Sequence, residues 1–522
     1  MTVWRAFWVP RRGTAAGVRT SLLPGWEDLP GLEERVGIKE GDPILLAPDY
    51  RVDELLSLYF RSRKFRRYTT ETKRNYVTDI CLFLNFLWAR GHAWNQAIED
   101  DLDDFEDWRR WSKDNLDRVS GAKWNRELAA LTGLYTWAEG KEILPRSPIA
   151  MKQVMGRNGE VLMAPVAKAK DAKRSDVRWL TPRAFRRWVD VGLRGHTAAG
   201  TPREDWVGRL EDRNSAFADL LYSTGMRLSE GGSLLIFEVP SIQLAGGRYY
   251  VGRLAAAVTR SKKPRTFYVA MNVLGEVEAY EQGLRAETVR KARAVGRYDV
   301  LPDIRLVTRV TSGTNREVHW CDCDGVPGKE KLTDLTVEQR MTLYTEGPDG
   351  PEPLWLWLNE QGMPFQPSSW EGVFRTANER CRDVLEPQHG TPGFDPYRST
   401  APQATPHSAR HSFALRMLVV LHHLMDRRLG LTPEERRDYR LLYGDPWRMV
   451  QDLLGHSSIE TTRDIYLAPV ADLQLRSLLD TAPLLGGDAG VMAEGSMDEL
   501  FARVARETEG IQDIDERMQV VA

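Results

Sequence analysis

A histidine and a tyrosine ten positions apart, His456 and Tyr466, lie in the segment LLGHSSIETTRDIYLAP. Ser457 and Glu460 have the S-x-x-E spacing of a capping box, which predicts a helix that starts after His456 and runs toward Tyr466. A helix N-terminus favours bound phosphate, and a tyrosine phenol beside phosphate is a potential nucleophile. The same pattern also fits a helix whose last tyrosine packs against a core with a solvated hydroxyl.

Arg227 and Glu230 lie in TGMRLSEG, where one predicted helix closes at Gly225 and the next opens. Arg227 is therefore expected at a helix–helix junction, with Glu230 one turn further on. Downstream, GRYYVGRLAAAVTRSKKPRTFYVAM predicts strands separated by a turn that carries Lys262 and Lys263. Lysines at a hairpin tip are ordinarily solvated residues that protect a sheet edge, so this pair alone does not indicate a site.

A third segment, TPHSARHSFALRML, carries two histidines and an arginine. Thr405 is expected to cap a helix with Pro406 at its first position, and His407 and Arg410 then lie one turn apart. His407 and His411 also have the spacing of a zinc-binding pair, but no Glu lies between them in the HExxH manner and no third ligand is near. Phosphate recognition is the favoured interpretation.

Two of the four cysteines form a second possible metal pattern. Cys321 and Cys323 follow His319 in HWCDCDG, but a second ligand pair at structural-zinc spacing is missing, so no metal is expected. The cysteines are also too few and too scattered for a disulfide framework, which indicates a reducing compartment. The other two are Cys81 and Cys381.

The net charge of −2 over 522 residues argues mildly against a nucleic-acid partner, but the charge is unevenly distributed. Residues 484–522 hold nine acidic and three basic residues, so the rest of the chain sums to about +4. Residues 152–178 alone carry seven basic and three acidic residues. No apolar run suggests a signal peptide or a transmembrane helix, and a cytoplasmic protein is expected.

The elements that must position these residues fall into two predicted domains with flanking segments. Thr181 and Pro182 start the second domain as helix cap and first helical residue. The predicted parts are an irregular extension (1–48), a helical domain (49–150), an extended basic linker (151–179), a mixed helical and β domain (180–483) with insertions near 285–352 and 424–445, and an acidic tail (484–522).

Three helices are expected in the first domain. Thr70 is expected to cap one that ends before Gly91, and the others cover about 102–111 and 122–139. Basic residues gather at one end of this domain and along the linker, where they are either solvated or in contact with phosphates. They are Lys64, Arg66, Arg67, Lys73, Arg74, Lys168, Lys170, Lys173 and Arg174.

The ordered set TGMRLSEG, basic hairpin, HSARH, LLGH and Tyr466 resembles the tyrosine recombinase, or phage integrase, family. The likeness covers most of residues 50 to 483. It implies a mainly α-helical protein with a small antiparallel β-sheet. It further implies a helical core-binding (SAM-like) domain and an α+β catalytic domain that close like a clamp around DNA.

The resemblance implies that Tyr466 attacks the scissile phosphate and gives a 3′-phosphotyrosyl intermediate with a free 5′-hydroxyl. Arg227 and Arg410 would hold the non-bridging oxygens, for which an arginine fork has the right geometry. His407 would assist proton transfer from the phenol, whose ordinary pKa is about 10. His456 would donate a hydrogen bond to the phosphate.

Supporting roles follow from the same resemblance. His411 is expected to support its helix, and Glu230 to orient neighbours of the site. The lysine that protonates the leaving oxygen is ambiguous, because ungapped alignment places Arg260 at its position, and arginine is a poor proton donor. Lys262 is the expected general acid with Lys263 second, while Lys263 and Arg265 are further candidates for DNA contact.

The family chemistry implies no cofactor, no ATP and no metal, since the phosphodiester energy is kept in the phosphotyrosine bond. Partners would be double-stranded DNA recombination sites, other protomers in a tetramer, and possible accessory proteins. Residues 467–483 would form a helix that docks either on a neighbour or on its own domain. The expected function is integration or excision of a mobile element; the alternatives are a DNA-binding protein with impaired chemistry and a type IB topoisomerase-like activity.

Overall fold

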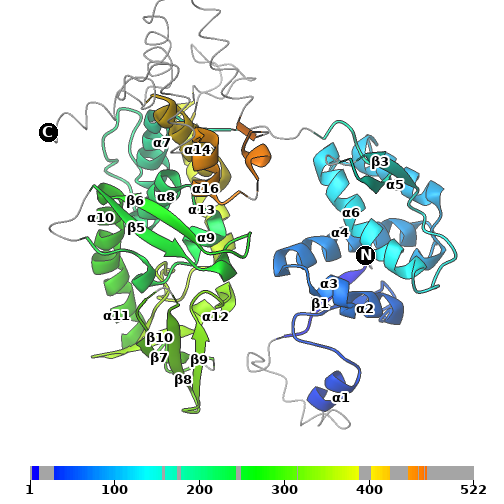
Figure 1. The fold of residues 1–522 in the computed structure, drawn as a ribbon, viewed down its shortest axis with the longest axis horizontal. Helices are drawn as coiled ribbons and strands as arrows, with labels where there is room; N and C mark the ends of the chain where they lie inside the picture. The colour runs from blue at the N-terminus through cyan, green and yellow to red at the C-terminus, as the bar shows by residue number, and fades with distance from the viewer. Residues whose placement is uncertain are drawn as a thin grey trace, which may run out of the picture. The chain divides into compact units, whose positions relative to one another are not determined.

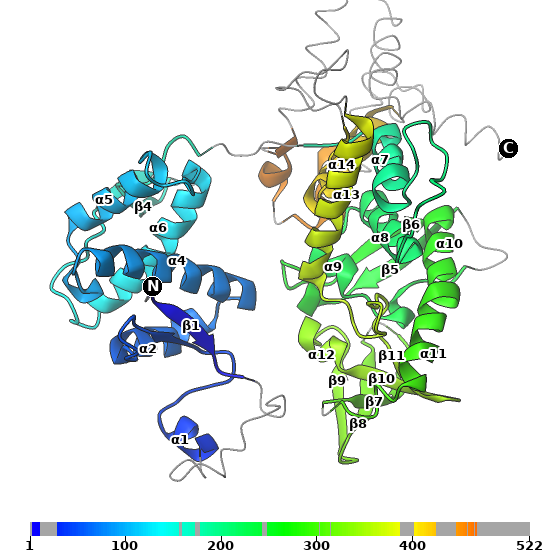
Figure 2. The same ribbon diagram turned by 180° about the vertical axis from the view of Figure 1, so that it is seen from behind.

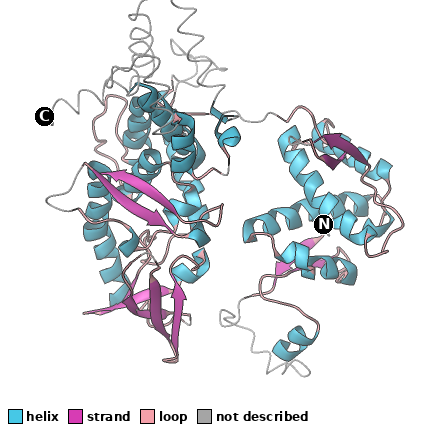
Figure 3. Ribbon diagram, in the orientation of Figure 1, coloured by secondary structure: helices cyan, strands magenta, loops and turns pink. Residues whose placement is uncertain are grey.

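The computed structural model divides the chain into two compact units, Met1–Ser175 and Asp176–Ala522, which are described separately (Figure 1). Helices dominate both units and small β-sheets accompany them (Figure 3), so the predicted fold class is confirmed. The residues that the structure describes are 3–10, 29–155, 159–172, 178–242, 248–301, 303–313, 315–386, 401–423, 445–456, 458–463 and 465–466.

Aromatic side chains form the core of the first unit, where Phe83 packs edge-on against both Tyr135 and Phe105, and Phe105 packs against Trp124. The long helix of this unit is capped one residue earlier than expected, because the Thr69 hydroxyl accepts a hydrogen bond from Thr72 N. The helices are α1 (Leu29–Arg35), α2 (Glu54–Arg61), α3 (Arg63–Arg66), α4 (Thr70–Ala89), α5 (Glu99–Arg110) and α6 (Gly121–Glu139).

The N-terminal segment, predicted as an irregular extension or small accessory region, contains regular structure. Strands β1 (Arg5–Trp8) and β2 (Pro43–Leu46) pair antiparallel. Trp4 joins the core of the helical unit, and its backbone N donates to Asn85 Oδ1 at 2.7 Å. The described parts of residues 1–48 therefore belong to the first unit, and burial of one tryptophan ties them to α4.

The predicted extended linker also contains regular structure. Strands β3 (Met151–Met155) and β4 (Val161–Pro165) form an antiparallel hairpin. The chain after it docks on α6, where Trp124 Nε1 donates to Ala167 O at 2.8 Å and Asn125 exchanges two hydrogen bonds with Ala169. Most hairpin side chains are exposed, so no alternation of apolar and polar residues marks the strands in the sequence.

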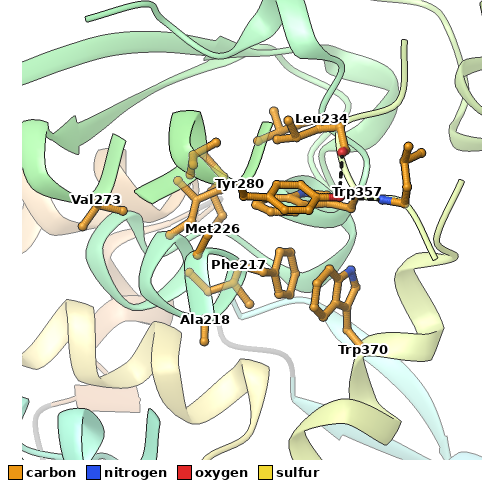
Figure 4. Close-up of a cluster of buried hydrophobic side chains, with 14 of the residues drawn as sticks. Phe217, Ala218, Met226, Leu234, Val273, Tyr280, Trp357 and Trp370 are labelled. Carbon is orange, nitrogen blue, oxygen red and sulfur yellow. Dashed lines mark hydrogen bonds between the residues drawn. The ribbon is translucent and has the colours of Figure 1, made fainter. Parts of the chain in front are cut away.

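The second unit is built around stacked aromatic rings beneath the Arg227 motif (Figure 4). Phe217 stacks on Trp370 with ring centroids 3.6 Å apart, and Tyr280 stacks on Trp357 at 5.4 Å. Trp357 Nε1 donates to Gly231 O at 2.8 Å and so anchors α9 on this core. The elements are α7 (Pro182–Trp188), α8 (Glu211–Thr224), α9 (Leu228–Gly232), β5 (Tyr249–Leu254), β6 (Arg265–Ala270), α10 (Met271–Tyr280), α13 (Trp370–Leu385), α14 (Pro406–His423) and α16 (Pro446–Leu454).

The segment expected as an aperiodic insertion folds into a five-stranded sheet in the order β11-β10-β7-β8-β9. β10 and β7 are parallel, and the other pairs are antiparallel. This sheet lies at the end of the unit opposite α7, α14 and α16 (Figures 1 and 2). Its strands are β7 (Arg305–Val310), β8 (Glu317–Asp322), β9 (Pro327–Lys331), β10 (Leu343–Gly347) and β11 (Gly350–Pro353), with α11 (Ala286–Ala294) and α12 (Val337–Met341) beside them.

Candidate functional site

Arg227 is held at the junction of α8 and α9 by the glycine before it and the carboxylate after it. Gly225 closes α8 with φ of 62°, and a Cβ there would lie 2.3 Å from the Phe413 ring, so only glycine fits. The Arg227 backbone N–H donates to Glu230 Oε2 at 2.9 Å, and its Nη1 donates to Oε1 at 3.0 Å. Glu230 is fully buried, so it orients this arginine from below the surface.

Arg410 joins the ends of two helices. From α14 its Nη1 donates to Gly225 O at 2.5 Å, and its Nη2 donates to Leu454 O at 2.6 Å. Both carbonyls lie at helix C-termini, where backbone acceptors lack intrahelical partners. Burial lowers the pKa of Arg410 to about 9, so the guanidinium keeps its charge at neutral pH. These contacts use two of the five N–H donors of the side chain.

Tyr466 is buried, with only 1 % of its surface exposed, and its hydroxyl lies 2.8 Å from His411 Nδ1. Its ring lies parallel to that of His456, with the centroids 6.4 Å apart. Burial raises the pKa of Tyr466 to about 12, against the opposing charges of Arg410 and Arg227. The phenol is therefore protonated in the unliganded site.

The histidine in contact with the phenol is not the one that the resemblance implies. His407 was expected to assist the phenol and His411 only to support the helix, yet His411 makes the hydrogen bond to Tyr466. The His407 ring lies edge-on to His411, with the centroids 4.2 Å apart. Burial, followed by the charges of Arg410 and Arg227, lowers the pKa of His407. His407 is thus next to the phenol's partner rather than bonded to the phenol.

His456 follows the C-terminus of α16, which Gly455 closes with φ of 64°. His456 Nδ1 lies 2.9 Å from Thr462 Oγ1, within the segment that leads to Tyr466. Ser458 Oγ accepts a hydrogen bond from Thr461 N at 3.3 Å, while the expected cap Ser457 lies outside the described residues. The His456 imidazole is therefore tied to the same short segment as the tyrosine.

Buried histidines make the site sensitive to acid. Burial lowers the pKa values of His411 and His456 to about 3, helped by His407 and Arg410 at His411 and by Arg410 and Arg227 at His456. In an unfolded chain the ordinary value is 6.5. Because the unfolded chain takes up these protons first, the stability contribution is complete above pH 6.5 and is lost as the pH falls toward 3.

Lowering the pH from 7 to 5 is therefore expected to reduce the free energy of unfolding of the second unit by about 1 kcal/mol for each of these histidines, allowing for partial solvent screening. Urea unfolding at several pH values measures this. The variant His411→Gln should show a shallower pH dependence than the wild-type chain. An equal slope in both chains would contradict the assignment.

The turn between β5 and β6 does not present Lys262 to the other candidates. Lys262 adopts a left-handed conformation with φ of 53°, and its Nζ donates to Ala257 O at 2.8 Å in its own loop. Lys263 is exposed. The charge of Arg260 instead contributes to the lowered pKa of His407.

Two of the predicted DNA contacts, Arg66 and Arg265, are partly or nearly buried and are paired with acidic residues. Arg66 forms an ion pair with Asp42 and donates to Gly37 O at 2.6 Å. Arg265 is also nearly buried and pairs with Glu230. The sequence shows their charge but not their burial. Of the other candidates, Lys64, Arg67, Arg74, Lys168 and Lys170 are exposed, Lys73 is half-buried, and Lys173 and Arg174 lie outside the described residues.

The histidine and cysteine pattern of β8 does not form a metal site in the described part of the chain. His319 Nε2 lies 3.6 Å from Glu317 Oε2 on β8, and Cys321 lies on the same strand. Within the described ranges, no three His, Cys, Asp or Glu side chains are grouped so that they could hold a metal ion. None of the helices described here is long and apolar enough to cross a membrane.

Residues 60–142 match the family profile described as phage integrase, N-terminal SAM-like domain. The predicted resemblance to phage integrases is confirmed for this helical part, which is a SAM-like domain of that kind. A search of curated protein sequences gave no match. The site residues lie outside the matched range, so their roles rest on their own geometry.

Several solved structures of recombinases and integrases align with most of the chain. The XerH site-specific recombinase bound to a palindromic difH substrate aligns over 82% of this chain and 85% of its own, with 12% identity and a TM-score of 0.41. The Tn1549 transposon integrase with transposon right-end DNA aligns over 80% and 99%, with 13% identity and a TM-score of 0.42. A lambda integrase dimer bound to a COC′ core site aligns over 79% and 95%, with 12% identity and a TM-score of 0.37.

Proposed function

We propose that the chain is a tyrosine site-specific recombinase that cuts and rejoins DNA strands to integrate or excise a mobile element. One observation carries the proposal. Residues from three separated segments meet around Tyr466, namely a buried arginine on α14, a carboxylate-bound arginine at the start of α9, and three histidines. A phenol beside cationic donors is suited to attack a phosphodiester.

The first chemical step follows from these contacts. Tyr466 Oη forms a bond to phosphorus, the bond from phosphorus to the 5′-oxygen breaks, and the DNA keeps a 3′-phosphotyrosyl link. The phenol proton would pass to His411 Nδ1, 2.8 Å away, in the tautomer whose Nδ1 carries no hydrogen. Burial keeps the pKa of this imidazole at about 3, so the proton uptake depends on the negative charge that the phosphate brings beside it. Transfer has to accompany attack, because a pKa of about 12 leaves little free phenolate at neutral pH.

Arg227 and Arg410 would stabilise the charge that develops on the non-bridging oxygens. Both are pre-oriented, the first by Glu230 and the second by two helix-end carbonyls, so little reorganisation accompanies the reaction. His407 and His456 lie beside the phenol and its partner, where a neutral imidazole N–H can donate to phosphate. The phosphotyrosine bond keeps the energy for rejoining, so ATP is not required.

DNA recombination sites are the proposed partners, bound by the exposed basic residues of the first unit and by Lys263 at the hairpin. A tetramer on paired sites, with residues 467–483 as a docking helix, is part of the same proposal; those residues lie outside the described ranges. Accessory proteins would act on this assembly.

Trapping of a covalent adduct tests the proposed function. Fragments of the DNA that flanks the coding sequence are incubated with the full chain and denatured, and protein-bound fragments are sequenced. Nicked duplexes with the recovered sequence should then accumulate a denaturant-resistant, protease-sensitive adduct and a free 5′-hydroxyl that polynucleotide kinase labels. A chain that binds these duplexes but never forms an adduct would instead be a DNA-binding protein with impaired chemistry.

The leaving oxygen needs a proton, and the turn residues can be tested for its source. A 5′-bridging sulfur leaves without acid catalysis, so it should restore cleavage only in the variant that lacks the general acid. Because Lys262 is bonded to its own loop, we expect Arg260→Ala to slow cleavage of the oxygen substrate more than Lys262→Ala does. Rescue of Lys262→Ala alone would show that this lysine turns toward bound DNA. Lys263→Ala serves as the matched variant from the same turn.

A further inference from the structure

Arg265, the first residue of β6, bridges two parts of the candidate site without lying at its surface. Its side chain is 8% exposed. Nη2 donates to Glu230 Oε2 at 2.6 Å, and Nη1 donates to Leu453 O at 2.6 Å. A guanidinium whose two terminal nitrogens are occupied in this way below the surface is not placed to contact the DNA backbone.

The bond to Leu453 fixes the end of α16, three residues before His456. The neighbouring carbonyl, Leu454 O, accepts from Arg410, so two arginines hold consecutive acceptors at this helix terminus. Gly455 lies against the Arg265 stem, and a Cβ at Gly455 would come within 2.9 Å of Arg265 Cδ. The peptide that leads into His456 is therefore packed directly on Arg265.

The hydrogen bond from Arg265 to Glu230 helps to position Arg227, on the other side of the site. Glu230 Oε1 accepts from Arg227 Nη1, while Oε2 accepts from both Arg265 Nη2 and the Arg227 backbone N–H. Burial alone would raise the pKa of Glu230, but Arg265 and Arg410 lower it below its ordinary value, so the carboxylate stays charged. Without Arg265 this buried carboxylate would lose the closer of its two ion-pair partners, and the position of Arg227 would change with it.

We infer that Arg265 is a positioning residue that holds Arg227 and His456 in register for phosphate attack, an inference that rests on the proposed function. It acts through Glu230 on one side and through Leu453 and Gly455 on the other. An arginine is required at this position, because lysine has a single side-chain nitrogen and cannot present a planar fork to two acceptors on different elements.

Single-turnover cleavage of nicked duplex at saturating DNA tests this role. Arg265→Ala should slow cleavage by about tenfold to a hundredfold while the Kd for DNA changes by less than about twofold, since the loss is one of geometry at the reacting group. Arg265→Lys should recover little of the rate. Gly455→Ala, which displaces the Arg265 stem, should slow cleavage in the same direction. Arg253→Ala is the matched control, since this exposed arginine lies on the partner strand β5 opposite Thr266 and should cleave at the wild-type rate.

A double-mutant cycle separates positioning from a general loss of fold. If Arg265 acts through His456, Arg265→Ala should lower the cleavage rate by less than about threefold when His456 is already replaced by alanine. The inference would be overturned if the rate losses of Arg265→Ala and His456→Ala multiplied fully in the double variant. It would also be overturned if Arg265→Ala cleaved at the wild-type rate, or if it bound DNA more weakly but cleaved normally at saturating DNA. Thermal melts show whether each variant is folded. If Arg265→Ala is unfolded, the cleavage rates of Arg265→Lys and Gly455→Ala test the inference in its place. A wild-type chain that never cleaves would instead refute the proposed function.

Discussion

Tyr466→Phe is expected to abolish the covalent protein–DNA adduct completely while leaving the Kd for DNA within about twofold. The substitution removes one oxygen, and that oxygen is the atom proposed to bond to phosphorus. The ring stays, so its parallel contact with His456 is kept. Denaturing gels of nicked duplex measure the adduct, and a mobility shift under native conditions measures binding.

Loss of the hydroxyl also leaves His411 Nδ1 without its partner in a buried place. An unpaired buried polar atom costs about 1–3 kcal/mol, so Tyr466→Phe should also lower the melting temperature slightly. Tyr222→Phe is a matched control. Tyr222 is a buried tyrosine of the same unit, and its hydroxyl donates to Leu180 O at 3.2 Å. This variant should lose similar stability and still form the adduct.

The two variants together distinguish chemistry from folding. Adduct formation by Tyr466→Phe would show that another nucleophile attacks the DNA, and the site would have to be reassigned. If neither variant formed the adduct, the assay would be responding to lost protein stability rather than to a lost nucleophile. Tyr466 is supported as the nucleophile only if Tyr466→Phe loses the covalent adduct while Tyr222→Phe still forms it.

Much of the fold was predictable because long amphipathic helices and their caps leave a clear pattern in the sequence. Thr181 accepts from Ala184 N and Thr405 from Ser408 N, each before a proline in the first turn, as predicted. The sheet β7–β11 was not predictable. Its strands have only four to six residues, and its one parallel pair, β7 with β10, is separated in the chain by β8, β9 and α12.

The site was predictable as a set of residues but not as a set of contacts. Sequence spacing cannot show which of two histidines four residues apart faces a tyrosine that lies 55 positions further on. The positive charges of Arg66 and Arg265 suggested DNA contact, yet buried acidic partners bind both. The left-handed conformation of Lys262 is likewise invisible in a turn with no glycine at that position.

Arg410→Ala is expected to slow cleavage at saturating DNA by about a hundredfold to a thousandfold, or about 3–4 kcal/mol of transition-state stabilisation. The side chain holds Gly225 O and Leu454 O, which frame Arg227 and His456, and its remaining donors are proposed to meet the phosphate. Arg410→Lys should recover little of this, since one ammonium cannot serve two carbonyls and a phosphate at once. Single-turnover rates with nicked duplex provide the measurement.

Arg416→Ala is the matched control for this prediction. Arg416 lies on the same helix, and its guanidinium carbon is 6.0 Å from the centroid of the Tyr222 ring rather than bonded to the helix ends around the site. We expect its cleavage rate to stay within about threefold of wild type.

Melting temperatures show how much of the Arg410→Ala effect is lost folding, because two buried carbonyls lose their donor. A variant that melts below the assay temperature is measured again at a lower one. Unchanged cleavage by a folded Arg410→Ala chain would mean that this arginine only joins helices, and that Arg227 alone faces the phosphate.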